Sequence, residues 1–189
     1  MTFFLKRLTQ RLAFPLTATA LLSACTGVPD GASPVASVDG ARYQGKWYEI
    51  ARFDHRFERG LECVTANYTP RNDGGIKVIN SGFDPKKNEW SQAEGKAYFL
   101  NVPTDGRLKV SFFGPFYSGY NILRLDEHYQ YALVSGPNHD YLWILSRTPT
   151  LPSATYDMLI EAAEQQHFDT RQLLKIDQQL PVCATRPTT

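Results

Sequence analysis

Short segments rich in Val, Ile, Tyr and Phe alternate with turn-forming residues along most of the chain. We expect eight strands, at residues 46–53, 62–69, 75–82, 89–101, 107–113, 119–125, 130–136 and 141–147. The breaks between them are rich in Gly, Pro, Asn and Asp, which favour turns. Such close spacing is typical of an antiparallel meander rather than of βαβ units. The pattern therefore predicts an all-β fold, in which eight up-and-down strands close into a barrel whose interior can hold one small ligand.

One segment that follows the predicted strands in the sequence has helical periodicity, and it begins near Pro152. Its apolar positions recur at i, i+3, i+4 and i+7, namely Tyr156, Leu159, Ile160 and Ala163. The opposite face carries three acids, Asp157, Glu161 and Glu164. A helix that lies on a membrane surface is usually basic there, so we expect a C-terminal helix packed on the outside of the sheet. A final short strand is expected at residues 173–176.

The composition is that of one globular domain. A chain of 189 residues, 42% of them hydrophobic and 21% charged, is long enough to bury a substantial core. Lys and Arg number 20 against 19 Asp and Glu, which gives a formal net charge of +1. There is then no overall field to attract nucleic acid or an anionic bilayer. We expect no nucleic-acid partner, and any charge selectivity has to be local.

Residues 1–24 have the layout of a signal peptide. Basic residues up to Arg11 precede an apolar run from Leu12 to Leu22, which is too short to span a membrane. The run ends in Leu22-Ser23-Ala24-Cys25, which resembles the lipobox of bacterial lipoproteins, where the cysteine is alkylated with diacylglycerol and becomes the new N-terminus. An ordinary secreted protein with a cysteine at this place is the weaker alternative.

The resemblance to lipoproteins implies a lipid anchor at Cys25. It also implies sorting to the outer membrane, facing the periplasm, because Thr26 and not Asp follows the cysteine. Residues 25–39 are rich in Gly, Pro, Ser and Ala without periodicity, which predicts a flexible tether, and residues 40–189 form the barrel domain. If Cys25 is acylated, the other two of the three cysteines, Cys63 and Cys183, are an even pair that can form a disulfide in the oxidising periplasm.

The start of the first strand, Gly45-Lys46-Trp47, resembles the first motif of the lipocalin family. Lipocalins place an arginine across this tryptophan at the end of the eighth strand, where Arg147 stands in this sequence. The second family motif, usually Thr-Asp-Tyr, is replaced by Asp126-Glu127-His128-Tyr129. The resemblance covers nearly all of residues 40–180 and implies that Gly45, Trp47 and Arg147 close one end of the barrel, by a cation–π contact of about 1–2 kcal/mol.

Side chains alternate between the two faces of a strand, so an inward Trp47 sets the phase for the pocket. The predicted ligand-binding residues are Glu49, Ala51, Ala66, Tyr68, Val78, Asn80, Ala97, Phe99, Val110, Phe112, Asn121, Leu123, Val134, Tyr141 and Trp143. This lining is apolar and aromatic with a few polar points, which suits an acyl chain oriented by one polar end. For any one of these positions, the sequence favours a side chain that contacts a ligand no more than a side chain that only fills a packed core.

The family resemblance implies a binding protein that stores or transports lipids, specifically lysophospholipids or fatty acids, for outer-membrane maintenance. Arg56, Arg59, Lys86, Lys87 and His139 in the loops could hold a phosphate head group, although Asp54, Glu58, Asp84 and Asp140 lie among them. His55, His128 and His167 lack partners at metal-ligand spacing, so no metal or cofactor is expected. An enzyme is disfavoured because there is no Gly-x-Ser-x-Gly elbow and Glu49 has no obvious partner carboxylate. Two alternatives are not excluded by the sequence: a structural lipoprotein with a filled barrel, and a homodimer.

Overall fold

The computed structural model describes residues 26–102 and 104–187, so the predicted signal peptide and Cys25 lie outside the described residues. Eight antiparallel strands close into a barrel, because β1 pairs with both β8 and β2. The strands are β1 (Gly45–Phe53), β2 (Glu62–Pro70), β3 (Ile76–Asp84), β4 (Glu89–Phe99), β5 (Arg107–Ser111), β6 (Ser118–Leu125), β7 (Tyr131–Ser135) and β8 (Leu142–Ser146). The predicted fold class is confirmed, with strand ends that differ by one or two residues at most positions.

The strand directions give the barrel two different ends. The closed end is formed by the short helix α1 (Gly40–Tyr43) and by the loops at residues 71–75, 100–106 and 126–130. The open end is formed by the loops at residues 54–61, 85–88, 112–117 and 136–141. Helix α1 was not predicted from the sequence, because four residues are too few to show a period.

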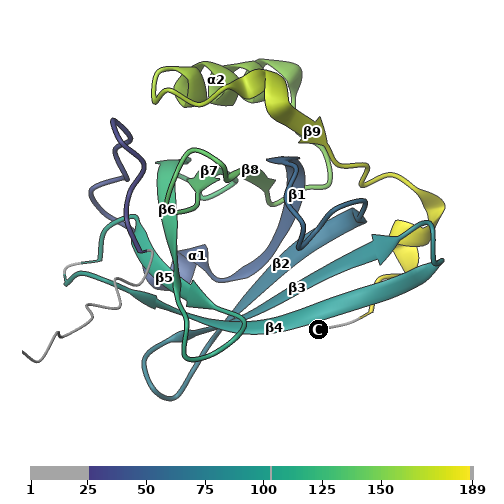
Figure 1. Cartoon of the computed structure of the whole chain (residues 1–189), viewed down its shortest axis with the longest axis horizontal. Helices are drawn as coiled ribbons and strands as arrows, with labels where there is room; N and C mark the ends of the chain where they lie inside the picture. The colour runs from purple at the N-terminus through teal and green to yellow at the C-terminus, as the bar shows by residue number, and fades with distance from the viewer. Residues whose placement is uncertain (1–25, 103, 188–189) are drawn as a thin grey trace, which may run out of the picture.

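The predicted C-terminal helix is α2 (Ser153–Glu164), and it packs on the outside of the barrel (Figure 1). Its buried residues Leu159 and Ala163 join a hydrophobic cluster with Phe53, Leu133 and Ile144 of the strands. The chain continues through η1 (Thr170–Gln172) to β9 (Leu173–Lys175), which pairs with the end of β1, and to η2 (Pro181–Thr185). Among the helices of the described residues, none has the length and apolar character needed to cross a membrane.

Residues 26–39, which we call the N-terminal strap, were expected to form a flexible tether, but they lie against the barrel. Val35 exchanges backbone hydrogen bonds with Ile122 and Gly106 at 2.9 and 2.8 Å, and Val38 is only 2% exposed. At the other end of the strap, the amide of Asn121 donates a hydrogen bond of 3.1 Å to the Gly27 carbonyl. The small residues predict a flexible tether, whereas the structure shows the strap hydrogen-bonded to β6 and to the loop before β5.

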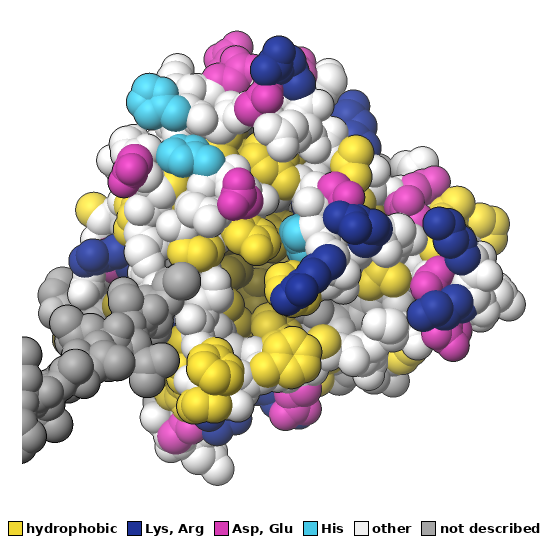
Figure 2. Space-filling view, viewed as in Figure 1, with side chains coloured by type: hydrophobic (Ala, Val, Ile, Leu, Met, Phe, Trp, Pro, Cys, Tyr) yellow, Lys and Arg dark blue, Asp and Glu magenta, His cyan; other side chains and the backbone are white. Residues whose placement is uncertain are grey.

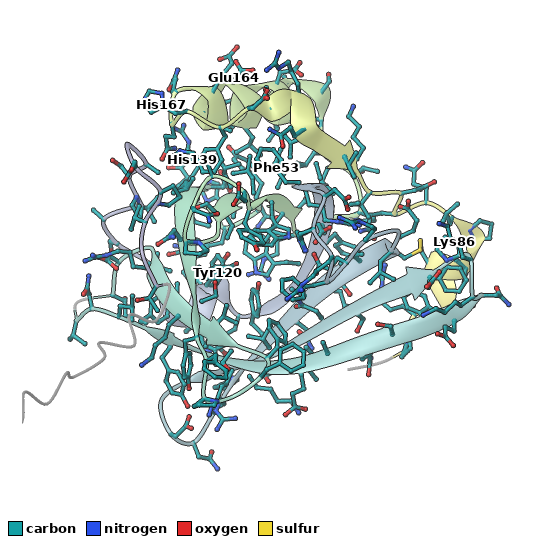
Figure 3. The ribbon with its side chains drawn as sticks, viewed as in Figure 1. Phe53, Lys86, Tyr120, His139, Glu164 and His167 are labelled. Atoms are coloured by element: carbon teal, nitrogen blue, oxygen red, sulfur yellow. A yellow bond between two sulfur atoms is a disulfide. The ribbon has the colours of Figure 1, made fainter. Side chains whose placement is uncertain are left out.

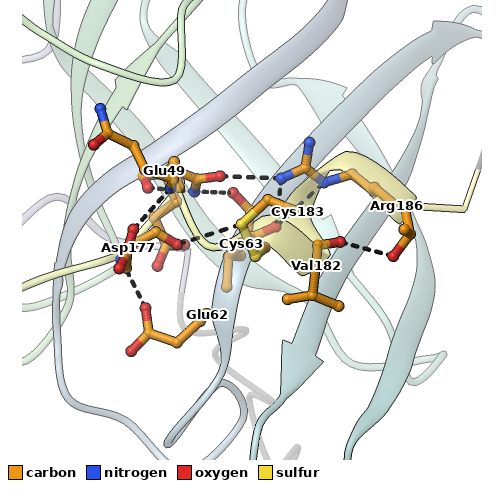
Figure 4. The surroundings of a disulfide bond; sticks show 11 residues. Glu49, Glu62, Cys63, Asp177, Val182, Cys183 and Arg186 are labelled. Atoms are coloured by element: carbon orange, nitrogen blue, oxygen red, sulfur yellow. Dashed lines mark hydrogen bonds between the residues drawn. A yellow bond between two sulfur atoms is a disulfide. The ribbon is translucent and has the colours of Figure 1, made fainter.

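The disulfide between Cys63 and Cys183 is confirmed, and it joins the start of β2 to η2 (Figure 4). Polar contacts fix the same C-terminal segment. The Gln178 amide donates hydrogen bonds to the carbonyls of Glu49 and Val64 at 2.8 and 2.7 Å, and the Arg186 guanidinium donates to the Cys63 carbonyl at 2.9 Å. The segment that follows α2 in the sequence is therefore held beside the open end of the barrel.

Candidate ligand-binding site

The closed end is sealed by Trp47, whose side chain is fully buried. Its indole nitrogen donates a hydrogen bond of 2.9 Å to the Tyr43 carbonyl, and the Arg147 guanidinium lies 3.9 Å from the centre of the Trp47 rings. Arg147 also donates to the carbonyls of Arg42 and Lys46 at 2.7 and 2.9 Å. Gly45 has a φ of 90°, and a Cβ there would lie 3.3 Å from Arg147, so the glycine permits both the turn and the close approach.

Three phenols form the floor of the cavity above this seal. The hydroxyl of Tyr120 lies 2.6 Å from that of Tyr43 and 3.1 Å from that of Tyr68. Burial raises the pKa of Tyr68 to about 12, and it raises the pKa of the other two phenols as well. The floor is therefore neutral at physiological pH and offers hydroxyl groups to a ligand. Figure 3 shows Tyr120 inside the ring of strands.

The cavity itself has a volume of about 110 Å³. Ligand pockets commonly measure about 300–1,000 Å³, so this one suits a narrow ligand in the conformation described. Its lining is mostly aliphatic and aromatic. Figure 2 shows a hollow floored by hydrophobic side chains, with Lys and Arg side chains beside it.

A charged cluster lies at the open end of the cavity. Arg52, only 2% exposed, donates a hydrogen bond of 2.7 Å to the Glu49 carboxylate and others to the carbonyls of Glu58 and Leu61. The second carboxylate, Glu58, lies 3.1 Å from Nε2 of His55 and accepts a hydrogen bond of 3.3 Å from the Trp143 indole. The loop at residues 54–61 is thereby folded over the mouth of the barrel.

The two carboxyl groups have opposite pKa shifts. Burial and the neighbouring Glu58 charge raise the pKa of Glu49 well above its usual range, although Arg52 opposes them. Burial also acts to raise the pKa of Glu58, but the hydrogen bond and charge of His55, the charge of Arg52 and the Trp143 hydrogen bond outweigh it and lower the pKa. Strongly perturbed pKa values cluster at functional sites.

Nine of the predicted pocket residues line the cavity: Glu49, Ala66, Tyr68, Val78, Asn80, Ala97, Val110, Phe112 and Trp143. Phe99 and Val134 instead fill the barrel interior in the same core cluster as Trp47. Tyr141 lies at the open end, where its ring stacks on Trp143 with centroids 6.1 Å apart. Asn80 brings a buried amide oxygen with no hydrogen-bond partner to the cavity wall, so this atom can accept a hydrogen bond from a ligand.

Three predicted pocket residues point the other way. Ala51 and Leu123 pack in the outer cluster under α2, and Asn121 holds the N-terminal strap. A β-bulge between Glu49 and Ala51 reverses the alternation in β1, and the register shifts again between Ile122 and Arg124 in β6. The phase of β6 was also wrong from its start, since Tyr120 lines the cavity instead of Asn121.

Eight cavity residues were not predicted: Tyr43, Glu58, Val64, Thr65, Ile76, Leu108, Tyr120 and Leu145. Strand alternation extended by one step would have found Val64, Ile76, Leu108 and Leu145, which are two residues from correctly placed neighbours. Tyr43 and Glu58 come from α1 and from a loop, where no periodic signal exists.

The basic loop residues do not converge on the mouth. Arg59 pairs with Asp54 at 2.9 Å, and Lys87 lies 3.6 Å from Asp84. Lys86 lies at the tip of the β3–β4 hairpin, and His139 lies beside α2, where its ring contacts that of Phe168 at a tilt of 54° (Figure 3). Of the five predicted head-group residues, Arg56 and Arg59 belong to the loop that carries the cavity residue Glu58.

Comparison with known proteins identifies the family. A sequence model described as a lipocalin-like domain matches residues 38–178. The chain belongs to the lipocalin family. A protein named outer membrane lipoprotein Blc from Vibrio cholerae is 54% identical over 170 residues, which cover 89% of this chain and 99% of the relative. The protein of the same name from Escherichia coli is 53% identical over 164 residues, with 86% and 93% covered.

Solved lipocalin-fold structures support the architecture. A major allergen from cockroaches superposes with a TM-score of 0.67 at 19% identity, covering 85% of this chain and 99% of that structure. The bacterial lipocalins add the cellular context, since the predicted outer-membrane location is confirmed by their names. Acylation at Cys25 stays a prediction. Membership of the family supports a role in binding small ligands.

Proposed function

We propose that this lipocalin binds a single-chain lipid, a lysophospholipid or a fatty acid, and stores or transports it for maintenance of the outer membrane. It would act as a carrier anchored through an acylated Cys25 and facing the periplasm, not as an enzyme. The observation that carries the proposal is the cavity, whose walls are mostly apolar and whose two carboxyl groups, Glu49 and Glu58, lie toward the open end. Apolar burial contributes roughly 25 cal/mol per Å² without demanding a precise shape, and this suits an acyl chain.

The polar end favours one of the two lipid classes. Glu49 and Glu58 both border the cavity, and one arginine and one histidine lie beside them. An ionised fatty acid would bring a third carboxylate to this cluster. The ammonium group of a lysophosphatidylethanolamine would instead pair with Glu58. We therefore place the acyl chain among Val78, Ala97 and Val110, and the amine of the head group beside Glu58.

A binding assay on a matched pair of variants tests this function. Ala97→Leu narrows the cavity, whereas Ala93→Leu makes the same change on the same strand at an exposed position. Displacement of a fluorescent fatty acid by palmitoyl-lysophosphatidylethanolamine should be at least about fivefold weaker for Ala97→Leu only, as expected for about 1–3 kcal/mol of overpacking. Palmitic acid serves as the anionic competitor.

Native mass spectrometry with lipid extraction, on protein taken from membranes, then identifies the natural ligand. A bound single-chain lipid is the expected result. Equal affinities for both variants would place the ligand elsewhere. If neither lipid bound and none was extracted, a structural lipoprotein with a filled barrel would be the better description, and the small volume of about 110 Å³ is the observation that favours this second function.

A further inference from the structure

The course of the N-terminal strap determines which end of the barrel lies near the lipid anchor. From α1 at the closed end, Val38 bonds to Thr104 and Val35 bonds to Ile122 and Gly106. Further back along the chain, the Ser33 amide donates to the Gln166 side chain beside α2. The strap then reaches the open end, where Gly27 and Thr26 lie against Gly119 at the start of β6 and Pro137 of the β7–β8 loop.

This path leaves almost no free chain between the barrel and the acylated residue. Cys25 directly precedes Thr26 in the sequence, and successive Cα atoms are about 3.8 Å apart. A freely extended strap of 14 residues would reach about 45–50 Å and permit any orientation. The bound strap instead brings the anchor to the rim of the open end.

The same rim has exposed aromatic side chains. Phe113 and Phe116 in the β5–β6 loop are 74% and 71% exposed, and Phe57 in the β1–β2 loop is 59% exposed. The whole β5–β6 loop, residues 112–117, reads Phe-Phe-Gly-Pro-Phe-Tyr and contains no charged residue. Exposed apolar groups clustered on one side of a soluble protein indicate an interaction surface. Beside Phe57, the Arg56 guanidinium lies 5.3 Å from the ring.

The net charge of the loops also differs between the two ends of the barrel. The closed end, α1 with its three loops, carries two bases, Arg42 and Arg71, and four acids, Asp73, Asp105, Asp126 and Glu127. The open-end loops carry four bases, Arg56, Arg59, Lys86 and Lys87, against three acids, Asp54, Glu58 and Asp140, and Asp84 at the adjoining end of β3 pairs with Lys87. An anionic lipid surface would repel the closed end and tolerate the open end.

We propose that the open end of the barrel faces the membrane in which the protein is anchored, with Phe57, Phe113 and Phe116 seated in the lipid interface. The partner is the bilayer that holds the acyl anchor. The cavity mouth then opens directly onto lipid, so a ligand can enter or leave without crossing water. This inference rests on acylation at Cys25 and not on the identity of the ligand.

Fluorescence quenching by lipids tests the orientation. Full-length acylated protein is reconstituted into vesicles of phosphatidylethanolamine and phosphatidylglycerol with brominated acyl chains, and the anchored fraction is isolated by flotation. Two variants each add one tryptophan at an exposed apolar position. Phe116→Trp places it at the open end, and Val102→Trp places it at the closed end, where Val102 is 98% exposed. Each spectrum is compared with that of the unsubstituted protein in the same vesicles.

The fluorescence added by Phe116→Trp should fall at least twofold in brominated vesicles, whereas that added by Val102→Trp should be unchanged. Equal quenching, or quenching of Val102→Trp alone, would overturn the proposal. The proposal would also be overturned if the open ends of two copies of the acylated protein packed against each other. Sedimentation in detergent would then show a dimer, and the double variant Phe113→Ser, Phe116→Ser would dissociate it. Lipid binding in solution, measured separately, is expected to survive these substitutions, so failure of the orientation leaves the carrier function unaffected.

Discussion

The two ends of the barrel use aromatic and charged residues in opposite ways. At the closed end, Trp47 is fully buried between Tyr43 and Arg147, and the arginine is bound to backbone carbonyls. At the open end, Trp143 is partly exposed and contacts His55 and Glu58, both carried by a loop. Both ends combine a tryptophan with charged side chains. At the closed end these residues are fixed by backbone hydrogen bonds, whereas at the open end they are held by side-chain contacts that a ligand can replace.

The difference separates stability from binding along one axis of the molecule. A fully packed aromatic contributes most when its neighbours cannot move to fill the space it leaves. A cluster of paired charges at a cavity mouth contributes less to stability, because desolvation offsets much of the attraction. We therefore expect substitutions at the closed end to affect folding first, and those at the open end to affect binding first.

Removal of the closed-end seal should have the largest effect on stability. Trp47→Ala should lower the free energy of unfolding by about 3–5 kcal/mol, because it leaves a large cavity and an arginine without its ring. Urea denaturation followed by circular dichroism measures this loss. Trp90→Ala is the matched control, since Trp90 is only partly buried on β4, and it should cost much less. Equal losses would mean that the seal is not a centre of stability.

Removal of the disulfide should come next. The bond closes a loop of 120 residues beside the open end, and disulfides typically contribute about 2–4 kcal/mol. We expect the double variant Cys63→Ala, Cys183→Ala to lie near the lower value, because Gln178 and Arg186 also hold the tail. Thermal denaturation of oxidised protein and of the double variant measures it. A loss as large as that of Trp47→Ala would show that the open end is as important for folding as the closed end.

Much of this architecture could be predicted from the sequence, for specific reasons. Strand positions followed from local composition and turns, and the Trp47 and Arg147 pair followed from family resemblance. Side-chain alternation placed Ala66, Val78, Ala97 and Val110 of β2 to β5 correctly, because no bulge interrupts the phase at these positions.

The remainder depended on long-range contacts. A bulge in β1 turned Ala51 outward, and a bulge follows from pairing with the neighbouring strand and not from local sequence. In β6 the starting phase was wrong, so Asn121 and Leu123 face outward while Tyr120 and Ile122 face the interior. The N-terminal strap is ordered by the surfaces of β6 and α2, which its own residues do not reveal. The partner of Glu49 was also missed, because Glu58 is brought to it by a loop.

The carboxyl pair predicts a pH dependence with two opposite components. Glu58 has a lowered pKa, so its contribution to stability is complete above the ordinary glutamate pKa of about 4.3 and is lost as the pH falls through the lowered value. Glu49 has a raised pKa, so its contribution is complete below about 4.3 and is lost as the pH rises through the raised value. The two residues therefore favour folding in different pH ranges.

Isosteric amides distinguish the two. At pH 7, Glu58→Gln should destabilise the fold by about 1.5–3 kcal/mol, since it weakens hydrogen bonds to a charged group. Glu49→Gln should cost less at pH 7 and should flatten the decline in stability at higher pH, because the amide still accepts from Arg52 without ionising. Urea denaturation between about pH 2.5 and pH 8 covers both the loss of the Glu58 contribution in acid and the loss of the Glu49 contribution at higher pH. The same pH profile for the two variants would contradict the opposite shifts.

The smallest loss of stability should come from the open-end tryptophan. Trp143→Ala should lower the free energy of unfolding by about 1 kcal/mol, as for a typical partly exposed position, because Trp143 is not sealed by regular structure as Trp47 is. Its loss should nevertheless weaken lysophospholipid binding at least about tenfold, about 1.4 kcal/mol, since the ring lines the cavity and its indole orients Glu58. Displacement titration and urea denaturation on the same preparation separate the two quantities. Trp143→Phe keeps the ring but loses the hydrogen bond, and an intermediate affinity at unchanged stability would assign part of the effect to Glu58. If Trp143→Ala lost stability and affinity in the same proportion as Trp47→Ala, the proposed division between the two ends would be wrong.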